Sequence, residues 1–328
     1  MSRVVGIDPG TLSFDLCGLD DGQVFLDASI TSPEVAAMPK VLVDALKQVQ
    51  PLDLVIGPSG YGLPWVQAKD LSDEDLFLLA LADERERGQP AGVGGLRQLV
   101  TLLGETGLPV VLMPGVIHLP TVPAHRKANK IDIGTADKLC SVALGIFDQA
   151  RRYQLPFQKT SFIYVEVGGA FTAVIAVENG QVVDGLGGSS GAPGFRALGG
   201  MDGELAYLLG TFSKKVLFSG GVAYIAGEPN MSPEEAISDG ADARTGAAWA
   251  ALFEGVTKCV AAEMTVVPSV REILLSGRLC RIPAILEILS HRLGKFAPVR
   301  QVQGLTATAK EAAQGAALIA DGLRGGSY

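Results

Sequence analysis

Two short stretches of the sequence place an acidic residue and glycine at the end of an apolar run. The first is VVGIDPGT (residues 4–11), in which Gly10 and Thr11 follow Asp8. Glycine lets a backbone approach a ligand closely, and exposed N–H groups with a threonine hydroxyl can hold phosphate oxygens. A carboxylate beside a phosphate is a typical magnesium ligand. The stretch alone is compatible with a phosphate and magnesium turn, or with a plain strand end capped by Asp.

The second stretch, EVGGAFT (residues 166–172), corresponds to the first at an offset of 158 residues. The positions that coincide are Asp8 with Glu166, Gly10 with Gly168, Asp21 with Asn179, and Gly22 with Gly180. Asp-Gly and Asn-Gly between apolar runs indicate hairpins, because both central residues of a type I′ turn have positive φ. The shared turn chemistry, acid position and spacing predict two copies of a three-stranded antiparallel meander.

Further strands and helices must position these turns. The expected strands lie at 52–57, 108–113, 216–219, 272–277 and 299–302, and the expected helical regions at 71–103, 135–153, 203–209, 239–264, 282–293 and 309–323. Strands alternating with helices after each meander predict mixed sheets covered by helices. We therefore expect an α/β fold of two duplicated lobes, residues 1–155 and 156–328, with a cleft between them and the closing helix in the second lobe.

Composition limits the classes of partner. The 328 residues are 48% hydrophobic and 19% charged, which suffices for two domains with proper cores. A net charge of −8 and a pI near 5.0 give no basic footprint for nucleic acid or an anionic membrane. The four cysteines form no CxxC pair and the three histidines lack metal-ligand spacing, so reduced structural thiols are expected. Without a signal peptide or a membrane span, the expected location is cytoplasmic.

A duplicated lobe with an acidic, glycine-containing first hairpin resembles the actin, Hsp70 and sugar kinase (ASKHA) superfamily. Within it, the sequence looks most like the acetate and butyrate kinase side, and most closely like a butyrate-kinase-like family, DUF1464. The resemblance implies lobes of ribonuclease H-like (actin-like ATPase) type, each with a mixed five-stranded sheet. It also implies ATP and Mg²⁺ as cofactors, a small-molecule substrate and a homodimer.

The resemblance assigns roles to the two acidic turns. Residues 6–11 correspond to the first phosphate loop, with Asp8 as the catalytic magnesium ligand and Gly10 and Thr11 at the phosphate. In the second phosphate loop, the matching residues are Glu166 at the metal and Gly168 and Gly169 at the phosphate.

The second loop departs from the family pattern, which is commonly Asp-x-Gly-Gly-Thr. Glu166 is one methylene longer than Asp, so its metal geometry must differ or be water-mediated. Ala170 stands where a threonine hydroxyl is expected, which removes one phosphate donor. These departures are expected to affect catalytic rate more than binding.

The nucleoside and the closing helix are also placed by resemblance. ILLSGRL (residues 273–279) looks like the adenosine motif, with Gly277 against the nucleoside. Arg278 is expected either to stack on adenine or contact a phosphate, or simply to begin a helix. The pair Gly220-Gly221, after the strand expected at 216–219, competes with Gly277 for the same role. Gly315 is implied to permit close helix packing near the nucleotide.

The segment from residue 118 to residue 138 carries the most chemistry and would border the cleft. Arg126 would bind a substrate carboxylate or the transferring phosphoryl group, and Lys138 would neutralise charge developing on transfer. Asp132 would orient or deprotonate the acceptor or serve magnesium, but only a hydroxyl acceptor needs a base. The alternative is a solvated charged loop before a helix cap. Residues 185–195, rich in glycine, could line the cleft or form a flexible loop.

These features together favour an ATP- and Mg²⁺-dependent phosphotransferase for a small metabolite such as a short-chain carboxylate. The alternative is an ATP-binding regulatory protein that uses lobe closure as a switch. An iron–sulfur activator ATPase of the same superfamily is disfavoured because the cysteines are unpaired.

Overall fold

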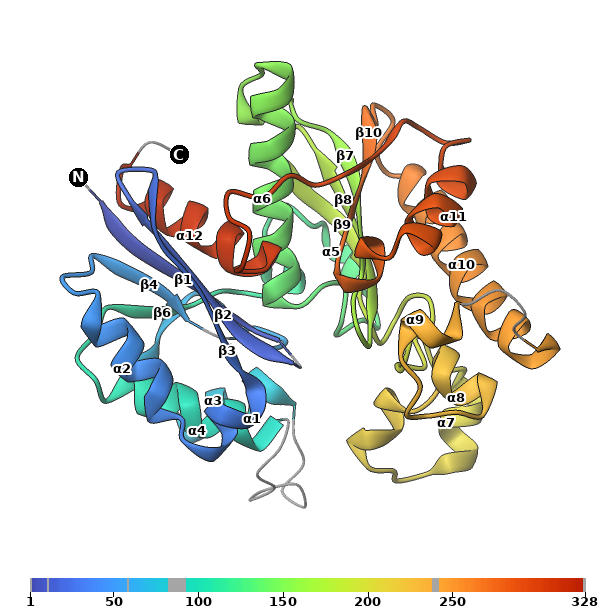
Figure 1. The fold of residues 1–328 in the computed structure, drawn as a ribbon, viewed down its shortest axis with the longest axis horizontal. Coiled ribbons are helices and arrows are strands. Elements are labelled where there is room, and N and C mark those ends of the chain that lie inside the picture. Colours follow the sequence, from blue (N-terminus) through green and yellow to red (C-terminus); the bar gives the residue numbers. More distant parts are fainter. Residues whose placement is uncertain (1, 11, 58, 82–92, 238–241, 327–328) are drawn as a thin grey trace. The chain divides into compact units, whose positions relative to one another are not determined.

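The computed structural model describes residues 2–10, 12–57, 59–81, 93–237 and 242–326, and it contains two sheets with their helices (Figure 1). Contacts divide the chain into two compact units. Unit 1 comprises residues 1–119, 135–148 and 303–328, and unit 2 comprises residues 120–134 and 149–302. Among the residues described, each unit contains one sheet.

The sheet of unit 1 is mixed. Its strands are β1 (Arg3–Pro9), β2 (Ser13–Asp20), β3 (Gln23–Thr31), β4 (Leu54–Gly57), β5 (Val66–Gln67) and β6 (Val110–Leu112), in the order β3-β2-β1-β4-β6-β5. Strand β1 is antiparallel to β2 and parallel to β4, and β4 is parallel to β6. The sheet has six strands rather than the five expected, because the short β5 adds an antiparallel edge.

The two faces of this sheet are covered differently. The helices of unit 1 are α1 (Ser32–Ala37), α2 (Lys40–Gln48), α3 (Asp73–Ala80), α4 (Val93–Gly104), the first part of α6 (Ala136–Tyr153) and α12 (Glu311–Leu323). Val5 and Ile7 lie in a core with residues of α2 and α4. On the other face α12 lies directly against β1, because a Cβ at Gly6 would be 2.3 Å from the Ala313 carbonyl oxygen (Figure 1).

The sheet of unit 2 is also mixed and has five strands. These are β7 (Phe162–Val167), β8 (Thr172–Glu178), β9 (Gln181–Leu186), β10 (Glu272–Ser276) and β11 (Val299–Gln301), in the order β11-β10-β7-β8-β9. The helices of the unit are α5 (Ala124–Lys127), α7 (Gly203–Leu209), α8 (Val222–Ala226), α9 (Pro233–Ala236), α10 (Ala243–Met264) and α11 (Pro283–Leu293). Together the two mixed sheets confirm the predicted fold class.

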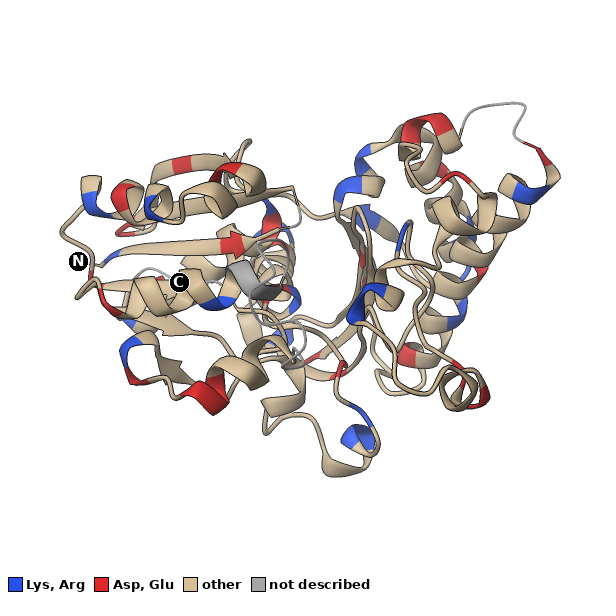
Figure 2. Ribbon diagram, turned by 90° about the horizontal axis from the view of Figure 1, so that it is seen from below, with Lys and Arg blue, Asp and Glu red and all other residues tan. Residues whose placement is uncertain are grey.

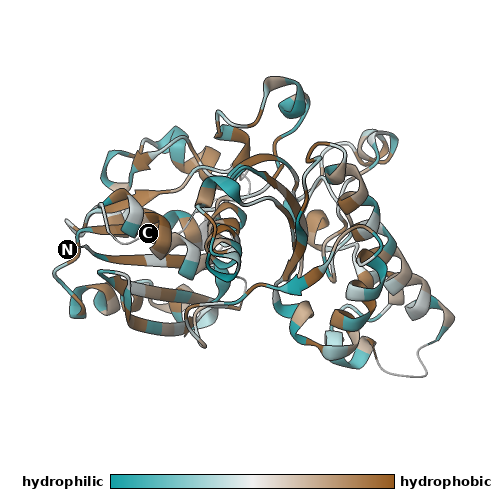
Figure 3. Ribbon diagram, turned by 90° about the horizontal axis from the view of Figure 1, so that it is seen from above, coloured by the Kyte–Doolittle hydropathy of each residue, from teal (hydrophilic) through white to brown (hydrophobic). Residues whose placement is uncertain are grey.

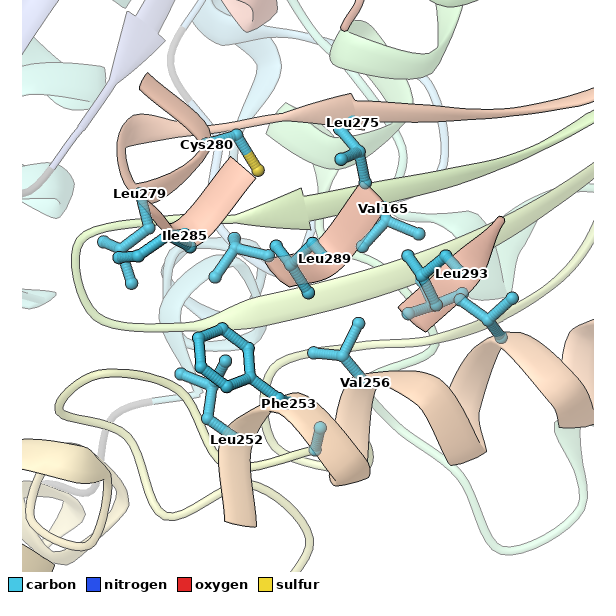
Figure 4. Packing of buried hydrophobic residues seen from close by; sticks show 14 of the residues in the cluster. Val165, Leu252, Phe253, Val256, Leu275, Leu279, Cys280, Ile285, Leu289 and Leu293 are labelled. Atoms are coloured by element: carbon cyan, nitrogen blue, oxygen red, sulfur yellow. The ribbon is translucent and has the colours of Figure 1, made fainter. Parts of the chain in front are cut away.

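Apolar residues concentrate along the strands of both sheets (Figure 3). In unit 2, Figure 4 shows Val165 and Leu275 of the sheet packed with Val256 of α10 and Leu289 of α11. All four side chains are at most 2% exposed, so α10 and α11 are held on this face by hydrophobic burial.

The predicted repeat is confirmed in backbone detail. Strands β3 and β9 begin at Gln23 and Gln181, which are 158 residues apart, and the preceding turn residues Asp21 and Asn179 have φ of 47° and 52°. Both meanders also contain a β-bulge. Leu26 and Val24 pair with successive residues of β2, which leaves Phe25 as an extra residue, and in β9 the extra residue is Val183. These two bulges again lie 158 residues apart.

The division of the chain differs from a single break after residue 155. Helix α12 contacts β1, β2 and β4, and so belongs with the first sheet rather than the second lobe. Conversely, residues 120–134 group with the second sheet. The expected cleft stays a prediction.

The strand expected at residues 216–219 is wrong. This segment is the 3₁₀ helix η5 (Lys214–Phe218), and the Ser213 hydroxyl accepts a hydrogen bond from the backbone N–H of Lys215 at its start. The amides of Gly220 and Gly221 then donate to the Arg196 carbonyl instead of to a strand. An apolar run before a double glycine resembles a strand in sequence, but its backbone bonds are local.

Charges of both signs are interspersed over the two units (Figure 2). All four cysteines are free thiols, and burial, assisted by the charge of Asp27, raises the pKa of Cys17 to about 12. Within the described ranges, no helix combines the length and apolar character needed to cross a bilayer.

Candidate functional site

In unit 1, two carboxylates lie together at the end of the first strand. Asp8 and Asp15 are directly opposite each other in the β1–β2 ladder, so both side chains lie on one face of the sheet. It is the face on which α12 packs, because Gly6, two residues before Asp8, contacts that helix. Asp8 is 6% exposed and Asp15 is 1% exposed. The predicted acid therefore has a buried acidic neighbour.

A lysine from the other end of the chain completes this cluster. Lys310 is the N-cap residue of α12, and its Nζ lies 2.7 Å from Asp15 Oδ2 and donates to Ser13 Oγ at 2.6 Å. A methyl group on Gly10 would lie 2.8 Å from Lys310 Nζ and 3.8 Å from Asp8 Oδ2. The predicted turn thus brings an acid and an ammonium group to the same point. Thr11, also predicted here, lies outside the described residues.

Sequence reasoning missed Asp15 and Lys310. A signal for Asp15 was available, because an acid stands in the apolar strand SFDLCGLD, opposite Asp8 once the hairpin turn is fixed. No comparable signal existed for Lys310.

The start of α6, also in unit 1, carries the predicted Lys138. Its Nζ lies 2.7 Å from Asp137 Oδ2, and the Thr135 hydroxyl donates to the same carboxylate. Burial acts to raise the pKa of Asp137, but Lys138 and the hydrogen bonds outweigh it, so the pKa is lowered. Burial and the charges of Asp137 and Asp8 raise the pKa of the Cys140 thiol.

In unit 2, the second acidic turn and the predicted adenosine turn meet. Strands β7 and β10 are parallel neighbours in which Glu166 pairs with Ser276. Gly277 has φ of +92°, and a Cβ there would lie 2.6 Å from the Val167 carbonyl oxygen and 3.0 Å from Glu166 Cγ. Only glycine fits this close approach. In the described part of the chain, the buried Ser276 hydroxyl has no hydrogen-bond partner.

The predicted phosphate and adenine groups of this turn are close together. The N–H of Gly168 donates to the Phe171 carbonyl at 2.9 Å and closes the turn between β7 and β8. A methyl group on Gly169 would lie 3.9 Å from Cδ of Arg278. Arg278 begins the 3₁₀ helix η6 (Arg278–Arg281), as the helix alternative expected, and its Nη2 lies 3.3 Å from Glu234 in an exposed ion pair.

Ala170, where the family pattern has threonine, is buried beneath a loop. Its carbonyl oxygen accepts hydrogen bonds from the N–H groups of Arg196 and Ala197, and its side chain is 8% exposed. Residue 170 is therefore packed within unit 2 and offers no hydroxyl to a phosphate.

Arg126 and Asp132, predicted to meet a substrate, are both engaged within unit 2. Arg126 Nη1 donates to the carbonyl of Val183, the bulge residue of β9, at 2.8 Å, and Nε lies 3.6 Å from Asp184 Oδ2. Asp132 is 6% exposed and accepts from the Gly134 N–H at 3.1 Å.

The glycine-rich loop is fastened to the other oxygen of Asp132. The N–H and the hydroxyl of Ser189 both donate to Asp132 Oδ2 at 2.9 Å, and the Ser190 hydroxyl donates to the Asp132 carbonyl. Residues 185–195 are thus tied down at this point. Roles of Arg126 and Asp132 toward a substrate stay predictions.

Gly315 serves the packing that was expected of it. A Cβ there would lie 1.7 Å from the Cys140 carbonyl oxygen, so α12 and the first part of α6 can touch only because residue 315 lacks a side chain. A contact with the nucleotide stays a prediction. Gly220 and Gly221, the rival nucleoside turn, lie against Leu198 and residues 194–196, and their contact with a nucleoside also stays a prediction.

The residues present fit magnesium and a phosphorylated ligand. Among the described residues, no group of three or more His, Cys, Asp or Glu side chains forms a complete metal cage. Mg²⁺ is usually bound by one or two carboxylates together with phosphates and waters, a role that suits Asp8. In unit 1, the Lys310 ammonium beside Gly10 supplies donors that suit phosphate oxygens.

Comparison with solved structures identifies the fold. A propionate kinase from Francisella tularensis subsp. tularensis SCHU S4 superposes with a TM-score of 0.64 at 16% identity, covering 96% of this chain and 99% of that one. An acetate kinase from Porphyromonas gingivalis gives 0.60 at 16% identity, covering 88% and 86%. A ROK hexokinase from Thermus thermophilus gives 0.51 at 16% identity, covering 96% and 97%. These likenesses establish the architecture.

The sequence itself has no significant match among curated proteins. A family model described as "Protein of unknown function (DUF1464)" matches residues 6–328, which is nearly the whole chain. The chain therefore belongs to the DUF1464 family and has the fold of the actin, Hsp70 and sugar kinase superfamily.

Proposed function

We propose that the protein is an ATP- and Mg²⁺-dependent phosphotransferase acting on a small metabolite, with a short-chain carboxylate as the acceptor. The observation that carries the proposal is the cluster at the first turn, where Asp8 and Lys310 lie beside Gly10 and Asp15 holds the Lys310 ammonium. The fold shared with acetate, propionate and sugar kinases supports it.

Bound magnesium nucleotide would supply the phosphoryl group and most of the charge neutralisation. Asp8, with Asp15 beside it, would hold the metal directly or through water. The backbone at Gly10, and at Gly168 and Gly169 in unit 2, would donate to phosphate oxygens. Gly277, which packs against Val167, would lie against the nucleoside, and the adjacent Arg278 would stack on it or contact a phosphate.

The bonds around Asp132 favour a carboxylate as acceptor. A hydroxyl acceptor needs a general base, whereas a carboxylate is already ionised. Both carboxylate oxygens of Asp132 already accept hydrogen bonds, from Gly134 and Ser189. An acceptor that requires no base is consistent with this arrangement. The protein is further proposed to be cytoplasmic and homodimeric, without nucleic-acid or membrane partners.

The first prediction tests the kinase. Isothermal titration with ATP and Mg²⁺ should show binding, and a panel of short-chain carboxylates should give acyl phosphates that hydroxylamine traps. Asp8→Asn should reduce transfer at least about 100-fold, because it removes the charged ligand of the metal. Asp44→Asn, on the exposed surface of α2, is the matched control and should leave transfer unchanged. Equal rates for wild type and Asp8→Asn would refute the assignment.

The alternative is an ATP-binding switch protein of the same fold. It is favoured by the second turn, where Glu166 replaces Asp and the buried Ala170 offers no hydroxyl. Nucleotide binding without transfer to any carboxylate or hydroxyl acceptor would select this alternative.

A further inference from the structure

Lys310 is held in place by three separate parts of unit 1. The Asp27 carboxylate of β3 accepts from the N–H groups of Thr308 at 3.1 Å and Ala309 at 2.7 Å, which fixes the segment before Lys310. Helix α12 begins immediately after it. At the far end of the side chain, Asp15 and Ser13 of β2 hold the ammonium group. Both the backbone and the ammonium group of Lys310 are therefore held in place.

The ammonium group faces the predicted phosphate turn. A methyl group placed on Gly10 would lie 2.8 Å from Lys310 Nζ, so the ammonium group lies beside this turn. An ammonium has three donors, and within the described residues the contacts of Lys310 Nζ are with Ser13 and Asp15. Its side chain is 34% exposed, whereas that of Asp15 is 1% exposed. Lysine thus presents a charge outward that the buried acid cannot present.

We propose that Lys310 binds the phosphate group of the ligand at the first turn, and that Asp15 is the positioning residue that aims it. The inference deepens the proposed function, on which it rests, by naming the ligand class of this turn as phosphate or pyrophosphate esters. The Asp8 carboxylate, 3.8 Å from the same methyl position, is the proposed metal ligand beside that phosphate. Lys310 therefore distinguishes phosphorylated ligands from the unphosphorylated nucleoside.

A purely structural role for Lys310 makes different predictions. If the lysine served only to neutralise the buried Asp15, removing it would leave an uncompensated charge and destabilise the whole unit. Binding of every ligand would then fall together, and the double variant Asp15→Asn/Lys310→Met would recover it. Under the proposal, the double variant is stable but still binds phosphate weakly.

Titration calorimetry with the full chain separates the two roles. The probes are adenosine, ADP with Mg²⁺, and pyrophosphate with Mg²⁺, and thermal denaturation of each variant runs in parallel. Lys310→Met should weaken ADP and pyrophosphate binding about 10- to 100-fold, as expected for a lost charged hydrogen bond, and leave adenosine unchanged. Lys310→Arg should recover most of the loss. Lys258→Met, on the exposed surface of α10, should change nothing.

Pyrophosphate and adenosine binding by Asp15 variants tests the positioning role of Asp15. Asp15→Asn should weaken pyrophosphate binding more than adenosine binding, and Asp15→Glu should restore part of it. Wild-type affinity for pyrophosphate in Lys310→Met, or recovery in the double variant, would overturn the inference even if nucleotide binding is real. Binding of pyrophosphate but not of adenosine or ADP would instead overturn the proposed function. In that case the pyrophosphate affinity of Lys310→Met still tests the role of Lys310. No binding of any probe by the wild type would overturn both.

Discussion

A single buried carboxyl group in unit 2 carries a pH dependence of folding. Glu263 of α10 is 4% exposed, and within the described residues its Oε2 atom has no hydrogen-bond partner. Burial, with the charge of Asp184 adding to it, raises the pKa of Glu263 from 4.5 to about 8, while Arg126 and Lys130 oppose the change. The raised pKa favours the protonated, neutral side chain in the folded protein at pH 7.

The second prediction follows from this proton. Between pH 4.5 and about 8 the folded state holds a proton that the unfolded state has lost, so the free energy of unfolding falls as pH rises and levels off above pH 8. The free energy of unfolding of the wild type should fall by about 2–4 kcal/mol between pH 5 and pH 8.5. Glu263→Gln cannot ionise, so it should not show this loss. Urea denaturation at both pH values measures it. Glu254→Gln, exposed on the same helix, should keep the wild-type profile; the same profile in Glu263→Gln would contradict the assignment.

At the scale of elements, the contact between α12 and α6 depends on one glycine. The third prediction is that Gly315→Ala lowers the free energy of unfolding by about 2–3 kcal/mol, because the new methyl group would overlap the Cys140 carbonyl and force the helices apart. Gly246→Ala in α10, where a Cβ has no neighbour within 4 Å, is the matched control and should stabilise by about 0.5–1 kcal/mol. Equal stabilisation of both variants would show that the helices are not in contact at this position.

Elements with strong local patterns could be predicted from the sequence, and contacts between distant residues could not. The meanders and helices such as α7 and α11 follow from turn chemistry and periodicity, which act over a few residues. The cluster at the first turn joins Asp15 to Lys310 across 295 positions, a pairing that no local pattern contains. Arg126 was predicted from its charge and from the place of its segment in the resembled fold, and neither shows that a bulge carbonyl accepts its hydrogen bond.

At the scale of the whole molecule, the first sheet depends on helix α12, which begins 280 residues after the end of β3. Helix α12 covers one face of β1, β2 and β4, and its buried residues include Ala313, Ala317 and Leu318. The fourth prediction is that a chain ending at Val302 retains a folded unit 2 and loses unit 1, because that face of the first sheet becomes exposed to water.

Hydrogen exchange distinguishes the two units in this truncated chain. Amides of β1 and β4 should exchange at unfolded rates, and those of β7 and β10 should stay protected. Wild-type protection of β1 would show that α12 is dispensable for the first sheet.

The two β-bulges affect how readily a second chain can pair with the sheets. Strands β3 and β9 are outer strands of their sheets, where unpaired backbone groups can recruit a second chain into a continuous sheet. A bulge bends and twists such a strand, which spoils the flat template that aggregation requires. Hydrogen bonds from Thr121 and Arg126 to the carbonyls of Val182 and Val183 further occupy β9. The irregularity at residues 25 and 183 therefore disfavours pairing of a second chain along β3 and along β9.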